Sequence, residues 1–369
     1  MYPDFDLGQH TRTITTSAPE AQLWFDRALN WCYGFNQEEG VSCFRKALEF
    51  DPDCAMAHWG VAYAAGPFYN FPWCDFCENE LVECTRLCFD HVTRARAQIG
   101  NLEVWEEALI EALSRRFQQP HPVSQDEFDR WDQDYVIGMR EAHHKLPEDL
   151  DVTALFAEAM MTQTPWKLWN VKTNEPADGA HTLESLAVLE QAIEQCNAQG
   201  KPQHPAILHL HIHVLEMSGE PERAMASADQ LGTLCPDAGH MNHMPAHIYV
   251  LCGQYDKARR TSIKAIEADR MYVEYAGPYN FYTTARCHDL HMMMYACMFL
   301  GQVEPAMEAA REMCATLTPD VIDNPHRPQM YVTMEGYFSM KMHVLVRFGK
   351  WQEILDEPMP EQPDLYCVS

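Results

Sequence analysis

Histidines recur at helical spacing in the second half of this sequence. Nine of the 18 histidines lie between His204 and His291. Two imidazoles four residues apart on a helix have Cβ atoms about 5–6 Å apart, close enough to bind one metal ion together. His209 with His213 and His243 with His247 are two such pairs, and together with several flanking histidines they predict a metal site. The predicted ligands are His209, His213, His240, His243, His247 and His291.

The type of ligand narrows the choice of metal. Neutral imidazole binds Zn, Cu, Fe and Ni, and a shell with few carboxylates disfavours Mg, Ca and Mn. We therefore expect a transition metal, with copper favoured over zinc or iron. The candidate histidines exceed the needs of one four-coordinate ion, which indicates one or two ions with further groups for proton transfer. His288 and Glu216 are the predicted catalytic groups, with metal ligation as the alternative for each.

Simpler explanations exist for these residues, and the sequence leaves them open. A single histidine on a helix is more often a surface group or a hydrogen-bonded core residue than a ligand. His211 falls on a packing position of its helix and fits that explanation, and His10 lies in a loop-like setting. Glu216, one turn beyond His213, is equally well explained as a charge at the rim of a groove. A histidine-lined groove could also bind an anion or an acidic peptide.

Aromatic residues supply the second half of the expected pocket. Trp59 and Tyr63 are four residues apart in a helical segment, and other aromatic residues lie in inserted loops. Loops that close over a groove exclude water and shape a site for a small molecule. The predicted substrate-binding residues are Trp59, Tyr63, Tyr69, Asn70, Tyr279 and Tyr282. The alternative is that the loops only cap the concave surface.

The sequence around the candidate histidines and aromatic residues shows a repeat that predicts helical hairpins. Segment 24–52 places Trp24, Ala28, Gly40 and Ala47 at the large and small positions of a 34-residue repeat of two helices. Further copies start at residues 55, 205, 239, 287 and 335, and glycine occupies position 15 in the last four. Insertions rich in aromatic residues separate several copies, at 67–77, 165–176 and 271–285. Signals of β-strands are almost absent.

The repeat resembles the tetratricopeptide repeat (TPR), strongly over residues 21–54, 205–272 and 335–356. Among TPR proteins the chain is similar to a bacterial and fungal group with few assigned functions. The segments that carry this likeness are DPDCAMAHWG at 51–60, GPxYN at 66–70, HxxHMPxH at 240–247 and RFGKW at 347–351. The resemblance implies an all-α, TPR-like α-solenoid of about eight helical hairpins with aromatic loop insertions.

The same resemblance implies a domain organisation and a place for the histidines. One superhelical domain over 1–369 would hold N-terminal hairpins at 21–98, middle hairpins at 101–200, histidine-rich hairpins at 205–315 and a C-terminal hairpin at 335–369. The histidines fall on positions 2, 5 and 9 of the first helix of a repeat, which in TPR stacks line the concave groove. Most TPR proteins are adaptors, so the resemblance alone favours a binding scaffold.

Composition limits the remaining functions. The chain has 54 acidic and 27 basic residues, and its net charge of −27 opposes nucleic-acid phosphates and anionic lipid surfaces. No apolar run reaches the roughly 18–20 residues of a membrane span, and the start lacks a secretory signal, so we expect a cytoplasmic protein that binds neither nucleic acid nor membrane. Cys74, Cys77, Cys84 and Cys88 could form a zinc knot, but Cys84 and Cys88 also fit one face of a helix.

The sequence therefore predicts a metal-dependent enzyme with a histidine-ligated mono- or dinuclear site in the concave groove. We favour an oxidoreductase that acts on a small molecule, aromatic ones included, by analogy with helix-borne dicopper sites. The alternatives are a metal-dependent hydrolase or lyase, a non-catalytic TPR adaptor that binds a peptide in the groove, and a metal-storage protein. The sequence leaves the substrate, the metal and the oligomeric state open.

Overall fold

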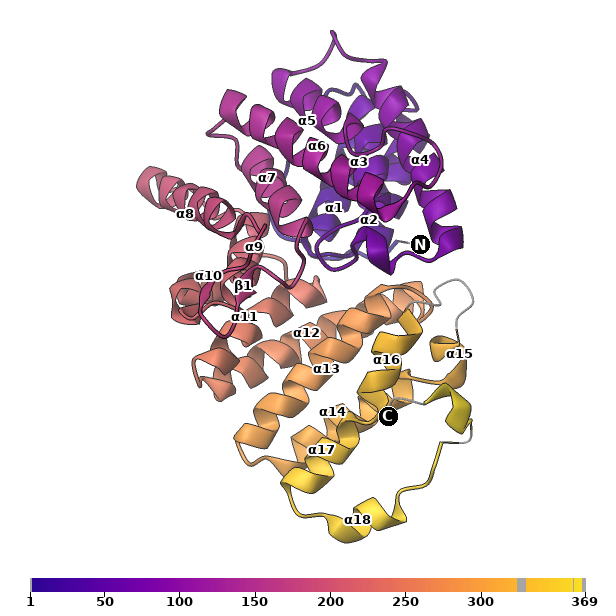
Figure 1. Ribbon diagram of the computed structural model, residues 1–369, viewed down its shortest axis with the longest axis vertical. Helices are drawn as coiled ribbons and strands as arrows, with labels where there is room; N and C mark the ends of the chain where they lie inside the picture. The colour runs from indigo at the N-terminus through magenta and orange to yellow at the C-terminus, as the bar shows by residue number, and fades with distance from the viewer. Residues whose placement is uncertain (1, 324–329, 361, 367–369) are drawn as a thin grey trace. The chain divides into compact units, whose positions relative to one another are not determined.

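The computed structural model describes residues 2–323, 330–360 and 362–366 (Figure 1). The chain divides into two compact units. We call residues 7–230 the N-terminal unit, and residues 231–369 together with residues 1–6 the C-terminal unit. Nearly all regular structure in the described residues is α-helical, which confirms the predicted all-α class.

The N-terminal unit is a succession of helical hairpins. Its first two are α1 (Pro19–Tyr33) with α2 (Gln37–Phe50) and α3 (Ala55–Ala65) with α4 (Glu78–Arg96). They are followed by α5 (Val104–Ser114) with α6 (Gln125–Lys145), α7 (Leu150–Thr162) with α8 (Thr182–Gln199), and α9 (Pro205–Leu215) with α10 (Met225–Leu231). The connections contain two 3₁₀ turns, η1 (Trp73–Asp75) and η2 (Pro221–Ala224), and a short antiparallel pair, β1 (Trp169–Asn170) with β2 (Glu175–Pro176).

Local sequence fixes where several of these helices begin. The side chain of Asn36 caps α2 by accepting a hydrogen bond from the backbone N–H of Glu39. Asp149 caps α7 in the same way, with Val152 as the donor. Pro205 occupies the first position of α9, where its missing N–H costs nothing. The start of α9 is therefore well defined, and with it the face on which the histidines of α9 lie.

Close packing between α2 and α3 depends on the glycine at position 60. A Cβ atom built on Gly60 would lie 2.6 Å from Cζ of Phe44 and closer still to two other atoms of that ring. Phe44 is fully buried and packs against Phe25, with 5.4 Å between the ring centroids. The ring of Phe44 cannot move away without opening the core of the first hairpin.

We expect Gly60→Ala to lower the free energy of unfolding by about 2 kcal/mol, because overpacking of a filled core outweighs the gain in helix propensity. Denaturation by urea would measure the change. Gly336→Ala is the matched control, because Gly336 is also helical and a Cβ built on it meets no described atom within 4 Å apart from its chain neighbours and the backbone of its own helix. A rise in stability at position 60 as well as at position 336 would contradict the tight fit of Phe44.

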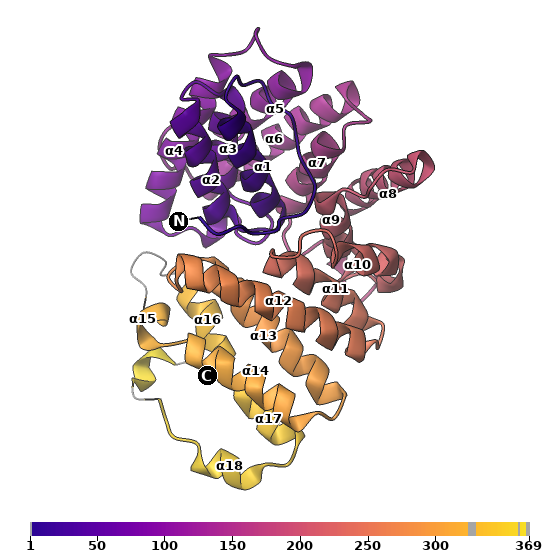
Figure 2. The same cartoon turned by 180° about the vertical axis from the view of Figure 1, so that it is seen from behind.

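The C-terminal unit is also built of helical hairpins. Helix α11 (Gly239–Leu251) pairs with α12 (Tyr255–Ala276), and α13 (Tyr282–Phe299) pairs with α14 (Val303–Thr316). Helix α13 packs against both α12 and α14, as the two opposite views show (Figures 1 and 2). The remaining elements are α15 (Pro319–Ile322), α16 (Met330–Phe338), α17 (Met340–Arg347), α18 (Trp351–Asp356) and η3 (Pro363–Leu365).

Three glycines end the first helix of a hairpin in this unit. Gly253, Gly301 and Gly349 have φ angles of 72°, 70° and 65°, in the left-handed region that favours glycine. They are the glycines at position 15 of the repeat, so the repeat phase read from the sequence holds at these three turns. The same position of the first repeat is Phe35, which also has a positive φ angle, 56°.

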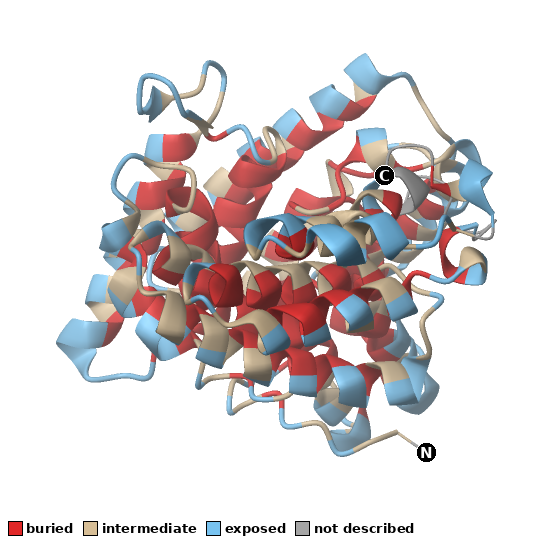
Figure 3. Cartoon of the chain, turned by 90° about the horizontal axis from the view of Figure 1, so that it is seen from below, coloured by how far each residue is buried: buried red, intermediate tan, exposed pale blue. Residues whose placement is uncertain are grey.

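Sulfur-containing side chains fill much of the core of the C-terminal unit. The buried cluster includes Met294, Met313, Met334, Cys287 and Cys297. Flexible thioethers fill irregular gaps between helices, which accounts for the methionines near the histidines. Figure 3 shows that buried residues follow one side of the helices and exposed residues the other, the pattern expected for amphipathic helices around a core.

The hairpin count agrees with the sequence. The described residues contain seven helical hairpins from α1/α2 to α13/α14, and α17 with α18 makes an eighth pair, close to the predicted number of about eight; α15 and α16 lie between them. The insertion expected at 271–285 is largely wrong, because α12 runs on to Ala276 and α13 begins at Tyr282. The segments 67–77 and 165–176 are mostly irregular, as predicted, but the second contains β1 and β2. One superhelical domain over 1–369 stays a prediction. None of the described helices is long and apolar enough to cross a membrane.

Candidate metal centre

Three histidines of the C-terminal unit converge. His243 and His247 lie one turn apart on α11, and His288 lies on α13. Nε2 of His247 lies 2.7 Å from Nε2 of His243 and 3.2 Å from Nε2 of His288. The three ligand atoms all lie within 4.8 Å of one another, so one ion could contact all of them. We call His243, His247 and His288 the histidine triad.

The spacing in the triad suits a metal ion after small shifts. Metal–nitrogen bonds of about 2.0–2.1 Å at tetrahedral angles place two nitrogens roughly 3.3 Å apart. The separation of 3.2 Å between His247 and His288 is close to that value. The 2.7 Å between His243 and His247 is a hydrogen-bond distance, so one ring donates to the other, and a bound ion would replace that proton. Three ligands leave a fourth coordination position open.

A buried carboxylate lies behind the triad. Oδ1 of Asp289 is 3.0 Å from Nδ1 of His243, and both side chains are fully buried. A histidine that binds a metal commonly donates its second ring N–H to a carboxylate, which leaves the other nitrogen for the ion. Asp289 is placed to do this for His243. Asp289 follows His288 directly in the sequence, but this adjacency did not indicate that its side chain meets His243.

Asp289 shares its surroundings with a second buried carboxyl group. Burial raises the pKa of Asp269, on α12, to about 7. Burial and then the nearby Asp269 raise the pKa of Asp289 well above its usual range. Tyr282, beside Asp269, accepts a hydrogen bond of 2.8 Å from the backbone N–H of His240 and so holds the first turn of α11.

The triad does not include the other two predicted ligands of this unit. His240 is buried on α11, and its ring centroid is 5.9 Å from that of His243. His291 is half-buried on α13, 5.8 Å from the ring of Tyr337. Burial and the nearby His343 lower the pKa of His291 to about 4.

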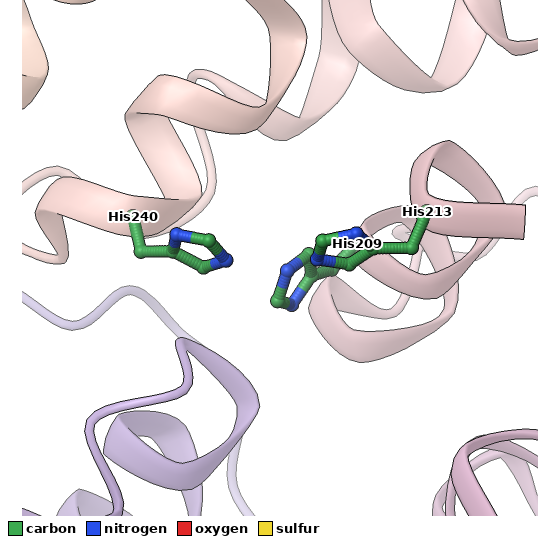
Figure 4. A group of neighbouring side chains, drawn as sticks. All are labelled: His209, His213 and His240. Atoms are coloured by element: carbon green, nitrogen blue, oxygen red, sulfur yellow. The ribbon is translucent and has the colours of Figure 1, made fainter. Parts of the chain in front are cut away.

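A histidine pair lies in the N-terminal unit. His209 and His213 are one turn apart on α9, both buried, with 4.7 Å between the ring centroids (Figure 4). Nδ1 of His209 donates to the backbone carbonyl of Tyr33 at 2.7 Å, and Nδ1 of His213 lies 2.7 Å from Oε1 of Glu216. Both rings therefore carry their proton on Nδ1 and their lone pair on Nε2, the form that binds a metal.

Glu216 and Phe35 set the surroundings of this pair. Glu216 is the hydrogen-bond partner of His213. The ring of Phe35 stacks on His213, with 5.3 Å between centroids and an angle of 16°, and lies 4.4 Å from His209. A positive φ angle at a residue other than glycine costs about 1–3 kcal/mol and often marks a functional site. Sequence reasoning missed Phe35, although the missing glycine at position 15 of the first repeat was a usable signal.

A single site formed by the histidines of α9 and α11 would join residues of two units. This part of the sequence prediction stays a prediction. Within each unit, the described residues offer the triad in the C-terminal unit and the pair His209 and His213 in the N-terminal unit.

The predicted substrate-binding residues of the N-terminal unit are mostly buried. Trp59 and Tyr63 stack on each other, with 5.0 Å between centroids, and Tyr63 donates a hydrogen bond of 2.5 Å to Glu158. Tyr69 is fully buried and accepts a hydrogen bond from the backbone N–H of Trp166. Tyr63 and Glu158 line a cavity of about 10 Å³, which has room for one water molecule. These residues are placed to pack the interior.

The remaining predicted substrate-binding residues differ in exposure. Asn70 is half-buried, and Tyr279 is 60% exposed. Tyr282 is buried at the start of α13, where it bonds to the backbone of His240. Of these three residues, Tyr279 is therefore the one most open to a ligand.

The cysteines confirm the helix-face interpretation. Cys84 and Cys88 lie one turn apart on α4, both buried, with 3.8 Å between the sulfur atoms. The thiol of Cys84 donates to the backbone carbonyl of Ala65. Cys74 is exposed, and Cys77 caps the start of α4. Among the described residues, no converging group of three ligand atoms includes a cysteine.

A third cluster joins residues that no sequence pattern connects. His10, Asp151 and His204 of the N-terminal unit bring their ligand atoms within 4.8 Å of one another. His10 precedes the first helix, so helical periodicity could not relate it to the other two residues.

The comparison with solved structures found proteins that resemble this chain. No family model matches the chain, and no curated protein matches it. The crystal structure of the TPR domain of P58(IPK) aligns with 91% of this chain and 98% of that chain, at 11% sequence identity and a TM-score of 0.23.

Proposed function

We propose that this protein is a metal-dependent enzyme whose histidine triad, His243, His247 and His288, binds one transition-metal ion. The observation that carries the proposal is the convergence of three Nε2 atoms with the carboxylate of Asp289 behind His243. Three imidazoles with an open fourth position are typical of catalytic metal sites. A peptide-binding scaffold has no need for such a set.

Copper is the metal that we favour, with zinc or iron as alternatives. The ligand atoms of the triad are all imidazole nitrogens, which suit copper and zinc better than Mg, Ca or Mn. A bound ion would supply electron transfer if it is copper, or a Lewis acid that activates water if it is zinc. We favour copper and electron transfer, and hence an oxidoreductase that acts on a small molecule. A hydrolase or lyase is the alternative, and the likeness to the bacterial and fungal TPR group remains part of the proposal.

The protein's own residues hold the ligands in position. Oδ1 of Asp289 lies 3.0 Å from Nδ1 of His243 and would accept the proton of Nδ1 once an ion binds Nε2, the atom that faces His247. Tyr282 fixes the first turn of α11, the helix that carries two of the three ligands.

We extend the proposal to a second metal ion, which the pair His209 and His213 would bind. Their Nε2 lone pairs are set by the hydrogen bonds of Nδ1 with Tyr33 and Glu216.

The metal content of the purified full chain tests the triad. We expect copper or zinc in the protein, and His243→Ala/His247→Ala should lose about one ion per chain. His291→Ala is the matched control, because His291 is also a half-buried histidine on α13 but lies outside the triad. The control should keep the ion, which separates the triad from the wider ligand set predicted from the sequence. Circular dichroism checks that both variants fold.

Two results would refute the triad as a metal centre. One is a metal-free wild-type protein, and the other is a double variant that keeps as much metal as His291→Ala. The TPR adaptor would then be the better interpretation, because the helical hairpins alone are sufficient for it. An adaptor predicts peptide binding that a chelator does not change. For a metal-loaded protein, the optical spectrum distinguishes copper from zinc.

A further inference from the structure

Two histidines and one carboxylate meet in the N-terminal unit. Oδ1 of Asp151 lies 3.0 Å from Nε2 of His10 and 3.1 Å from Nε2 of His204. The three residues come from the segment before α1, the first turn of α7 and the residue before α9. The side chains of Asp151 and His204 are buried, whereas that of His10 is 17% exposed, so solvent reaches the cluster from the side of His10.

Three hydrogen-bond contacts of this cluster meet on one carboxylate oxygen. The hydroxyl of Tyr33 donates to the same Oδ1 atom of Asp151 at 2.6 Å. A carboxylate oxygen offers about two lone pairs. Tyr33 and both imidazoles therefore place three hydrogen-bond contacts on one oxygen, more than its two lone pairs accept at full strength. A cation bound by Oδ1 and the two Nε2 atoms would replace the protons of the imidazole contacts.

Within the described residues, no hydrogen bond at Nδ1 fixes which ring nitrogen of His204 carries the proton. Its Nδ1 atom is buried and makes no hydrogen bond with a described residue. The hydrogen bond at one ring nitrogen normally decides which nitrogen carries the proton. Since no such bond forms at Nδ1, the proton of His204 can leave Nε2 when a cation binds there.

We infer that the N-terminal unit binds a divalent metal ion such as Fe²⁺. Its ligands are Nε2 of His10, Oδ1 of Asp151 and Nε2 of His204. Two imidazoles and one carboxylate with open positions form the ligand set of non-haem iron(II) sites. Octahedral bonds of about 2.1 Å place neighbouring ligand atoms roughly 3.0 Å apart, and the observed separations are 3.0 and 3.1 Å. The inference uses no residue of the triad and stands independently of the proposed function.

The surroundings hold the three ligands in place. Arg12 donates from Nη1 to Oδ2 of Asp151 at 3.2 Å, which leaves Oδ1 as the ligand atom. Asp149 accepts from Arg12 at 2.5 Å and balances its charge, so the guanidinium opposes a bound cation only weakly. Asn30 donates to the backbone carbonyl of His10 at 2.9 Å and ties the irregular segment to α1.

The test counts the Fe²⁺ bound by the full chain under anaerobic conditions. The background is His243→Ala/His247→Ala, so that the triad does not contribute. In this background we expect His10→Ala to bind about one ion fewer per chain, or to bind it at least about tenfold more weakly. His144→Ala, an exposed histidine on α6, is the matched control and should bind as the background does. The visible absorption of Co²⁺ bound in place of Fe²⁺ gives a second readout that does not depend on activity.

Equal Fe²⁺ binding and equal Co²⁺ spectra in His10→Ala and in the control would overturn the inference. Asp151 would then be a hydrogen-bonded anchor of the N-terminal segment. His10 lies outside the helices, so its replacement should leave the fold intact. Asp151→Asn removes the ligand charge while keeping the side-chain shape, and it should lower Fe²⁺ binding as His10→Ala does. The comparison of His10→Ala with His144→Ala stays valid even if the triad binds no metal, because both variants carry the same replacements of His243 and His247.

Discussion

Replacing Asp132 by alanine should lower the free energy of unfolding by about 3–5 kcal/mol. Asp132 lies on α6 and accepts a hydrogen bond of 2.7 Å from Nε of Arg116, whose side chain is only 3% exposed. Burial raises the pKa of Asp132, and the guanidinium of Arg116 opposes that rise. Removal of the carboxylate would leave a buried positive charge without its partner, which is strongly destabilising. Urea denaturation of the full chain would measure the loss.

The same region supplies a matched control. Arg115, the neighbour of Arg116, pairs with Glu141 on α6, but both of these side chains are exposed. Exposed ion pairs contribute about 0–1 kcal/mol, so Glu141→Ala should change the stability little. Equal small losses in Asp132→Ala and Glu141→Ala would contradict the buried ion pair. A large loss in Asp132→Ala alone would support it.

The fold was predictable because its signals are local. A TPR-like hairpin is set by large and small residues at helical spacing and by a tight turn, all within 34 residues. The turns at Gly253, Gly301 and Gly349 adopt the positive φ angles that their place in the repeat required. The start of α13 was placed too late, because an aromatic and glycine-containing stretch was interpreted as a loop. Tyr272 and Tyr282 instead pack against each other from α12 and α13, with 5.0 Å between centroids.

The candidate site was only partly predictable, because the partners of a helix face depend on how neighbouring helices are rotated. Spacing alone placed His243 and His247 on one face of α11. It could not choose between His288 and His291, which are three residues apart on α13. The structure brings His288 to the pair and leaves His291 beside Tyr337. The position of Asp289 behind His243 follows from the same rotation, so no sequence spacing could reveal it.

The contacts of the N-terminal segment were beyond the reach of sequence patterns. His10 precedes the first helix, and its partner Asp151 is 141 residues away in the chain. Only the folded unit brings them together with His204. His211 is the opposite case, since its packing position in the repeat predicted a buried structural histidine and the structure places it in the interior.

Replacing His211 by glutamine should make folding less sensitive to acid. Burial lowers the pKa of His211 to about 4, although Glu190 lies 3.7 Å from its Nε2 atom and acts in the opposite direction. An unfolded histidine has a pKa of about 6.5. Between these two values the unfolded state binds a proton that the folded state does not, so the stability present above about pH 6.5 is lost as the pH falls. The pKa difference corresponds to about 3 kcal/mol once the pH is below both values.

Urea unfolding near neutral pH and at about pH 4.5 would measure this difference. Over that range the wild-type protein should lose about 2–3 kcal/mol more stability than His211→Gln. The other histidines titrate in both proteins, so their contributions cancel and the difference reports His211 alone. Glutamine can still bond to Ser227, which lies 2.9 Å from Nδ1 of His211, so the variant should remain folded. His144→Gln, at an exposed position on α6, should follow the wild-type protein. Parallel pH curves for His211→Gln and the wild-type protein would mean that His211 accepts a proton in the folded state without penalty, which its burial does not allow.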